Sequence, residues 1–335
     1  MSYPKGTLLI IGGHEEKNLE GTAPEILLRQ DNPQRFRILG KLLATQPYAH
    51  HDIQIIASAS SIPEEMEALY RQAYQSVGFK EVSFIHVNCT EDACEEEAIK
   101  RIHYSHAVFF TGGDQLRLMD QMRDTPLLEA IKKKYYADPN FIVAGTSAGA
   151  MAIPEKIIGR GRIEEALMKQ DLRMSTGFGL VSNMIVDTHF VKRGRFGRLA
   201  LAVAMNPECI GIGLGEDAAL MIRDGNEATS IGSGMVIVID PTDMGATNAP
   251  YAALNDQIVI ENLRVHILAG GSQYLIHERQ FRLADTQMEP NASPAVPEVP
   301  ENAVDNLKLS KEKQDAVNRK QSPAEKREVL GENNN

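Results

Sequence analysis

A serine stands between two glycines in the stretch Gly145-Thr146-Ser147-Ala148-Gly149. Apolar residues 141–144 come directly before it and small residues follow, which predicts a buried strand, a sharp turn and the start of a helix. Glycines two positions to either side permit a strained turn and close approach of the backbone. Such a turn lifts a serine hydroxyl out of the sheet and frees the next amide, that of Ala148, to donate to an oxyanion. Ser147 is therefore a candidate nucleophile, with a plain strand-to-helix turn as the alternative.

A serine nucleophile needs a base, and His189 is the best placed of the nine histidines. It follows the apolar residues 184–186 at the end of a predicted strand, and strand alternation puts Asp187 on the same face. The acid that orients the histidine stays open at this point, because Glu164, Glu165 and Asp187 all fit the spacing.

A basic run, residues 192–198, follows the histidine and contains Arg193, Arg195 and Arg198. A solvated basic turn at the start of a helix would explain this run without any function. In a chain with a formal net charge of -10, however, three arginines beside a candidate base can also hold substrate carboxylates through paired hydrogen bonds.

The elements that must position these residues follow from the hydrophobic pattern. Apolar segments at 7–11, 53–57, 82–87 and 107–110 alternate with helical patterns ahead of the serine turn. Their short connections predict an α/β fold with a doubly wound, mostly parallel sheet flanked by helices. Ligands bind beyond the carboxyl ends of such strands, where the glycine turns would meet. After about residue 210, strands joined by tight turns predict antiparallel additions at one edge of this sheet.

Composition sets limits on the class of protein. The 335 residues predict a single α/β domain at 1–285, and a hydrophilic tail at 286–335 that we expect to be disordered. The acidic balance argues against nucleic acid or an anionic membrane as the main partner. We find no signal pattern, no apolar run of membrane-spanning length and three cysteines without zinc-type spacing, so we expect a cytoplasmic protein. No complete dinucleotide or P-loop motif occurs, and no cofactor is expected.

Several motifs resemble one family over about residues 5–283: I-I-G-G-H-E-E-K, A-S-A-S-S-I-P-E-E-M, F-F-T-G-G-D-Q, G-T-S-A-G-A-M and above all D-T-H-F-V-K-R-G-R-F-G-R-L. The family is that of the cyanophycinases, serine peptidases that share the class I glutamine-amidotransferase-like fold with peptidase E. The resemblance implies an exopeptidase that hydrolyses the aspartate backbone of cyanophycin, a polymer with arginine on each β-carboxylate, and releases β-Asp-Arg dipeptides. It also implies a homodimer that needs no metal.

The resemblance implies roles for individual residues. Ser147 would be the nucleophile, His189 the general base and Glu165 the acid, with the backbone amides of Gly113 and Ala148 forming the oxyanion hole. The substrate-binding positions fall on Gln115, Asp187, Thr188, Arg193, Arg195 and Arg198. At Thr188 the chain departs from the cyanobacterial enzymes, which carry Gln there, so one amide donor is lost.

Two other functions fit the same residues. One is an aspartyl or isoaspartyl dipeptidase of the peptidase E kind, which has less use for three guanidinium groups after the histidine. The other is a non-catalytic binding protein on the same fold, which the joint presence of serine, histidine and acid disfavours.

Overall fold

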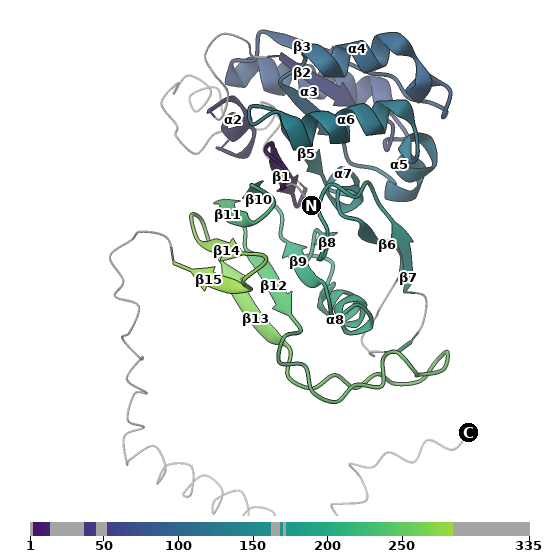
Figure 1. Cartoon of the computed structure of the whole chain (residues 1–335), viewed down its shortest axis with the longest axis vertical. Helices are drawn as coiled ribbons and strands as arrows, with labels where there is room; N and C mark the ends of the chain where they lie inside the picture. The colour runs from purple at the N-terminus through teal and green to yellow at the C-terminus, as the bar shows by residue number, and fades with distance from the viewer. Residues whose placement is uncertain (1–2, 14–36, 45–51, 162–167, 170–171, 284–335) are drawn as a thin grey trace, which may run out of the picture. The chain divides into compact units, whose positions relative to one another are not determined.

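A computed structural model of the chain describes residues 3–13, 37–44, 52–161, 168–169 and 172–283. In this part, the main sheet has nine strands in the order β15-β14-β11-β10-β1-β5-β4-β2-β3 (Figure 1). Its parallel half confirms the predicted α/β architecture. The parallel strands are β1 (Thr7–Ile11), β2 (Asp52–Ile56), β3 (Glu81–Phe84), β4 (Ala107–Phe110) and β5 (Ile142–Thr146).

Helices cover both faces of this sheet because the strands are apolar on both sides. In β1, Leu8 and Ile10 belong to one buried cluster, and Leu9 and Ile11 to another. The first cluster includes side chains of the helices α4 (Glu96–Tyr104), α5 (Gln115–Met122), α6 (Pro126–Ala137) and α7 (Ala148–Ala152). The second includes side chains of α2 (Arg37–Ala44) and α3 (Pro63–Val77). A short 3-10 helix, η1, spans Asp92–Cys94 between β3 and α4. The connections therefore wind the chain around the sheet on both sides.

The strands of the C-terminal third divide between two sheets, and this corrects the expectation that all of them lie at one edge. Only β10 (Ala218–Arg223), β11 (Glu227–Gly232), β14 (Gln273–Leu275) and β15 (Gln280–Arg282) extend the main sheet, in antiparallel fashion. A second sheet has the order β13-β12-β9-β8, formed by β8 (Met184–Thr188), β9 (Ile210–Leu214), β12 (Val236–Asp240) and β13 (Arg264–Leu268).

A tight turn separates β9 from β10 and explains the division. Asp217 in this turn has a φ of 49°, in the left-handed region, so the chain cannot continue as one strand through residues 211–222. Strands β8 and β9 run parallel to each other, and their carboxyl ends therefore meet at the same edge. The helix α8 (Phe196–Met205) packs on this sheet, and β6 (Lys156–Arg160) pairs with β7 (Arg173–Thr176) as a separate hairpin.

Residue contacts group Met1–Ala284 into one compact unit. The predicted disordered tail at 286–335 lies outside the described residues. Among the residues that are described, no helix is both long and apolar enough to cross a membrane.

Candidate active site

Ser147 occupies the sharp turn between β5 and α7. Its φ of 51° and ψ of -114° lie in a region that residues other than glycine rarely adopt. The turn is closed by the amide of Ser147, which donates to the carbonyl of Ile11 at 3.0 Å. Gly145 and Gly149 are required here, because a β-carbon on Gly145 would lie 2.6 Å from the backbone of Gly149. The predicted strand, turn and helix are therefore present, with the serine hydroxyl at the apex.

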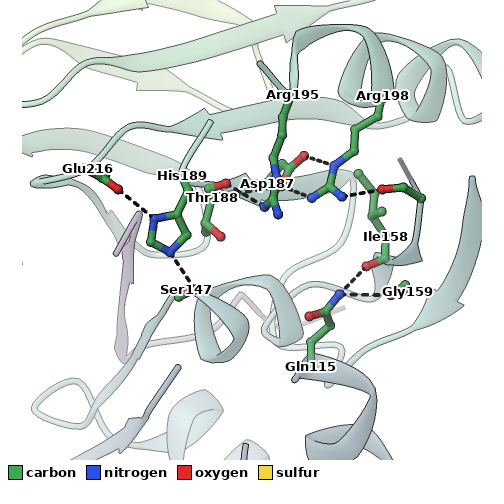
Figure 2. Close-up of polar contacts among 11 residues, drawn as sticks. Gln115, Ser147, Ile158, Gly159, Asp187, Thr188, His189, Arg195, Arg198 and Glu216 are labelled. Carbon is green, nitrogen blue, oxygen red and sulfur yellow. Dashed lines mark hydrogen bonds and ion pairs between the residues drawn. The ribbon is translucent and has the colours of Figure 1, made fainter. Parts of the chain in front are cut away.

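His189 faces this hydroxyl. Its Nε2 lies 3.0 Å from Ser147 Oγ, which is hydrogen-bonding distance (Figure 2). His189 follows the end of β8 with a φ of 50°, and its amide donates to the carbonyl of Gly12 at 3.0 Å. A β-carbon on Gly13 would lie 2.4 Å from the ring of His189, so the imidazole packs directly against the backbone of this glycine. The structure thus brings together the two residues that the sequence singled out.

Within the described part of the chain, a carboxylate that contacts His189 belongs to Glu216, which was not among the predicted acids. Its Oε1 lies 3.2 Å from His189 Nδ1, and the ammonium of Lys192 lies 3.1 Å from the same oxygen. Glu216 follows β9 as His189 follows β8, and these two strands are parallel neighbours. A prediction that β8 and β9 pair in parallel would therefore have pointed to Glu216. Glu164 and Glu165, the other acids considered, lie outside the described residues.

Asp187 does not point toward His189, although strand alternation placed the two on one face. Its carboxylate is fully buried and accepts hydrogen bonds from Arg195 at 2.9 Å and from Arg198 at 2.6 Å (Figure 2). The alternation rule fails because His189 has left the extended conformation, as its positive φ records. A carboxylate that is buried and paired in this way is not presented to a substrate.

The three arginines after the histidine differ in what they can still bind. Arg198 is buried and donates from Nε and Nη2 to Asp187 and from Nη1 to the carbonyl of Gly161. Arg195 uses Nη1 for Asp187 and for the carbonyl of Thr188, and burial lowers the pKa of its guanidinium. Arg193 is exposed. Capacity to hold a carboxylate from the substrate therefore rises from Arg198 through Arg195 to Arg193.

Two more predicted substrate-binding residues, Gln115 and Thr188, differ in whether their side chains are already hydrogen-bonded to the protein. The amide nitrogen of Gln115 donates to the carbonyls of Ile158 and Gly159, both at 3.0 Å, and fastens α5 to β6 (Figure 2). Thr188 is fully buried, and its hydroxyl has no hydrogen-bond partner within the described part of the chain. The amide hydrogens of Gln115 are therefore used within the protein, whereas the buried hydroxyl of Thr188 keeps its donor.

The proposed oxyanion donors lie next to the serine. Ala148 is the first residue of α7, a position whose amide has no acceptor within its own helix. The Gly112-Gly113 turn runs close by, since a β-carbon on Gly112 would lie 3.3 Å from Ser147 Cβ. Gly113 has a φ of 145° and packs against the carbonyl of Ala59. Glycine is required at position 113, because a β-carbon there would lie 1.9 Å from the carbonyl oxygen of Ala59.

This arrangement can perform acyl transfer. A histidine held by a carboxylate can take the proton of a serine hydroxyl as that hydroxyl attacks a carbonyl, and neighbouring amides can stabilise the oxyanion. Among the described residues, no group of three or more histidine, cysteine or acidic side chains is placed to hold a metal ion. The fold and the site together have the form of a hydrolase.

Comparison with known proteins gives the family. Residues 30–230 match Peptidase family S51. Similar curated proteins include a cyanophycinase of a Nostoc species, 34% identical over 82% of this chain and 87% of its own length, and a cyanophycinase of Thermosynechococcus vestitus, 35% identical over 69% of this chain and 71% of its own. The chain belongs to peptidase family S51 and is a peptidase.

A solved structure supports the fold. The crystal structure of a peptidase from an acI-B1 Actinobacterium matches with a TM-score of 0.56 and 20% identity, and the match covers 82% of this chain and 99% of that one. At this identity the likeness concerns the architecture alone.

Proposed function

We propose that the chain is a serine-type exopeptidase that hydrolyses the aspartate backbone of cyanophycin and releases β-Asp-Arg dipeptides. The observation that carries the mechanism is the 3.0 Å contact between Ser147 Oγ and His189 Nε2 on a strained turn. The relatives named cyanophycinase, which match over most of the chain, support the substrate.

In this mechanism His189 takes the proton of Ser147 while the hydroxyl attacks the backbone carbonyl of an aspartyl residue. Glu216 keeps the imidazole oriented and stabilises its charged form, in place of Glu165, for which the resemblance implied this role. The amides of Gly113 and Ala148 stabilise the oxyanion. The amine leaves with the proton from His189, and water then hydrolyses the acyl-enzyme with the histidine again acting as base.

The exposed Arg193 and the guanidinium nitrogens of Arg195 that do not contact Asp187 would hold the carboxylates of the polymer. Asp187, itself held by Arg198, would keep Arg195 in position. This distribution favours a branched substrate that presents several carboxylates over the small peptides of a dipeptidase. A homodimer, a cytoplasmic location and the absence of nucleic-acid partners remain predictions from the sequence.

The test is release of β-Asp-Arg from purified cyanophycin, measured by mass spectrometry for the full chain and for Ser147→Ala. We expect the variant to release none while it keeps the wild-type circular-dichroism spectrum. Cyanophycin and Asp-X dipeptides, offered together to the unmutated protein, separate the two activities. Preferential cleavage of the dipeptides would replace the proposal with the peptidase E alternative.

A further inference from the structure

The carboxylate of Glu216 has a second partner besides His189. The ammonium of Lys192 lies 3.1 Å from Glu216 Oε1 and donates to Oε2 at 3.2 Å. Oε1 is also the oxygen that lies 3.2 Å from His189 Nδ1. Glu216 therefore stands between an imidazole and an ammonium, and only the first of these contacts has a role in the mechanism above.

A tight turn directly after His189 brings Lys192 to this position. The amide of Arg193 donates to the carbonyl of His189 at 3.0 Å, and the amide of Gly194 donates to the carbonyl of Val191 at 3.1 Å. Gly194 has a φ of 59°, which glycine adopts readily. The turn folds the chain back, so that a lysine three residues after the histidine contacts the same carboxylate as the histidine does.

Stability does not explain the contact. The Lys192 side chain is 64% exposed, and ion pairs of such exposed lysines contribute little to the free energy of unfolding. The side chain of Glu216 is less exposed and that of His189 is nearly buried, so both are less screened by water than the lysine is. We therefore expect Lys192 to act on the histidine more than on the fold.

A positive charge at this point opposes part of the effect of Glu216. A carboxylate beside an imidazole favours the protonated ring, whereas a nearby ammonium disfavours it. Because Lys192 and His189 both contact Oε1, the ammonium lies within about 6 Å of Nδ1, a distance at which two unit charges repel each other even in water. A general base that is already protonated cannot accept a proton. A carboxylate that orients the ring is thus most useful when a cation offsets part of its charge.

Other charged groups lie near the imidazole and stay the same when Lys192 is changed. On β8, α8 and the turns after β8 and β9, they include Asp187, Arg193, Arg195, Arg198 and Asp217. Asp187 is paired with two of these arginines, and the carboxylate of Asp217 accepts hydrogen bonds from Ser233. The turns after β1 and β5 approach the ring with Gly13 and Ser147, which carry no charge. A difference between variants at position 192 therefore reports the lysine itself.

We propose that Lys192 is a positioning residue of the candidate active site: it holds the Glu216 carboxylate on His189 Nδ1 and offsets part of its charge, so that the imidazole stays free to accept a proton near neutral pH. The proposal rests on the proposed function, because it assumes that His189 acts as a general base.

The experiment compares the full chain with Lys192→Met, which keeps an unbranched side chain and removes the charge. The value of kcat/KM for a short oligomer of β-Asp-Arg units is measured from about pH 5 to pH 9, because its acid limb reports the base of the free enzyme. We expect the midpoint of this limb to move to higher pH by about half a unit in Lys192→Met. Activity below the midpoint should then fall about threefold, while the plateau at higher pH stays near the wild-type value.

Two control variants isolate the charge. Lys192→Arg keeps a cation at the same position and should keep the wild-type midpoint. Lys133→Met removes the same charge from an exposed position on α6 and should also leave the midpoint unchanged. In about 0.5 M salt the difference between wild type and Lys192→Met should shrink, because the lysine is exposed to screening ions.

A second readout does not depend on the substrate. The ring resonances of His189 are identified in the NMR spectrum of the histidine-labelled chain by their absence from His189→Gln. Their titration in wild type and in Lys192→Met should show the same upward shift of the midpoint as the kinetic profile.

The outcomes separate the two proposals. If the wild-type chain releases no dipeptide from cyanophycin, the proposed function fails, and the NMR titration still decides whether Lys192 acts on His189. If the chain cleaves cyanophycin but Lys192→Met has an unchanged or lowered midpoint, the role of Lys192 is refuted and the proposed function stands. Equal loss of kcat/KM at every pH would indicate a merely structural role and would also overturn the assignment.

Discussion

Two carboxylates reach the neighbourhood of His189, and their surroundings differ. The Glu216 side chain is 28% exposed, contacts the imidazole and also forms an ion pair with the exposed ammonium of Lys192. Asp187 is fully buried and held by two guanidinium groups. Asp187 is two residues from the histidine in sequence and Glu216 is 27 residues away. Whether an acid can orient His189 therefore depends on its contacts in the fold, and its distance from the histidine along the sequence does not predict this.

A third carboxylate sharpens this comparison. Asp240 in the second sheet is also fully buried, and it lies 3.0 Å from Arg279 and 3.8 Å from Arg264. It resembles Asp187 in its chemistry, although its hydrogen bonds lead to Thr242 and Tyr274 and not to the candidate active site. A buried aspartate with two arginine neighbours thus occurs both beside the candidate active site and away from it.

The largest effect is expected for Glu216→Gln. Gln keeps the size of the side chain but removes the charge that stabilises a protonated imidazole, so kcat/KM should fall about 10²–10⁴-fold with little change in melting temperature. Steady-state cleavage of cyanophycin measures this. Glu227→Gln, an exposed glutamate on β11, serves as the control. Activity that survives Glu216→Gln would return the role to Glu165 or Glu164.

Asp187→Asn and Asp240→Asn should both lower stability, with different effects on activity. Asp187→Asn leaves two largely buried guanidinium groups without their counter-charge, which costs about 3–5 kcal/mol of unfolding free energy. Asp240→Asn should cost less, because its arginine partners are more exposed and Arg264 also pairs with Asp243. Only Asp187 joins α8 to the end of β8, so only its variant should lose turnover at a temperature where both remain folded. Urea unfolding and kcat/KM of the two variants provide the comparison. Full activity of Asp187→Asn would remove any link between this cluster and catalysis.

The smallest effect concerns acid stability. Burial by itself would raise the pKa of Asp240, but hydrogen bonds from Thr242 and the charge of Arg279 outweigh it and hold the pKa below its ordinary value of 3.8. A lowered pKa in the folded state contributes stability that is complete well above pH 3.8 and is lost as the pH falls through the folded value. The difference in unfolding free energy between wild type and Asp240→Asn should therefore shrink below about pH 4. A difference that is constant with pH would contradict this account.

Much of the architecture was predictable because it follows from local patterns. Apolar runs predicted the parallel strands, and the glycines around Ser147 predicted the turn that carries it. Glu216 was missed because its position depends on the parallel pairing of β8 with β9, a contact between distant segments that no local pattern reports. The side-chain direction at Asp187 was misjudged because the alternation rule was extended across His189, whose backbone is no longer extended.

The backbone at Ser147 and His189 has one more consequence. Both residues hold left-handed φ values, near 50°, and such conformations cost on the order of 1–3 kcal/mol each in residues other than glycine. A protein that only carried a ligand would gain stability by relaxing these two positions with glycine. The chain instead places a hydroxyl and an imidazole at these two strained positions, so the reactive geometry is held at a cost in stability.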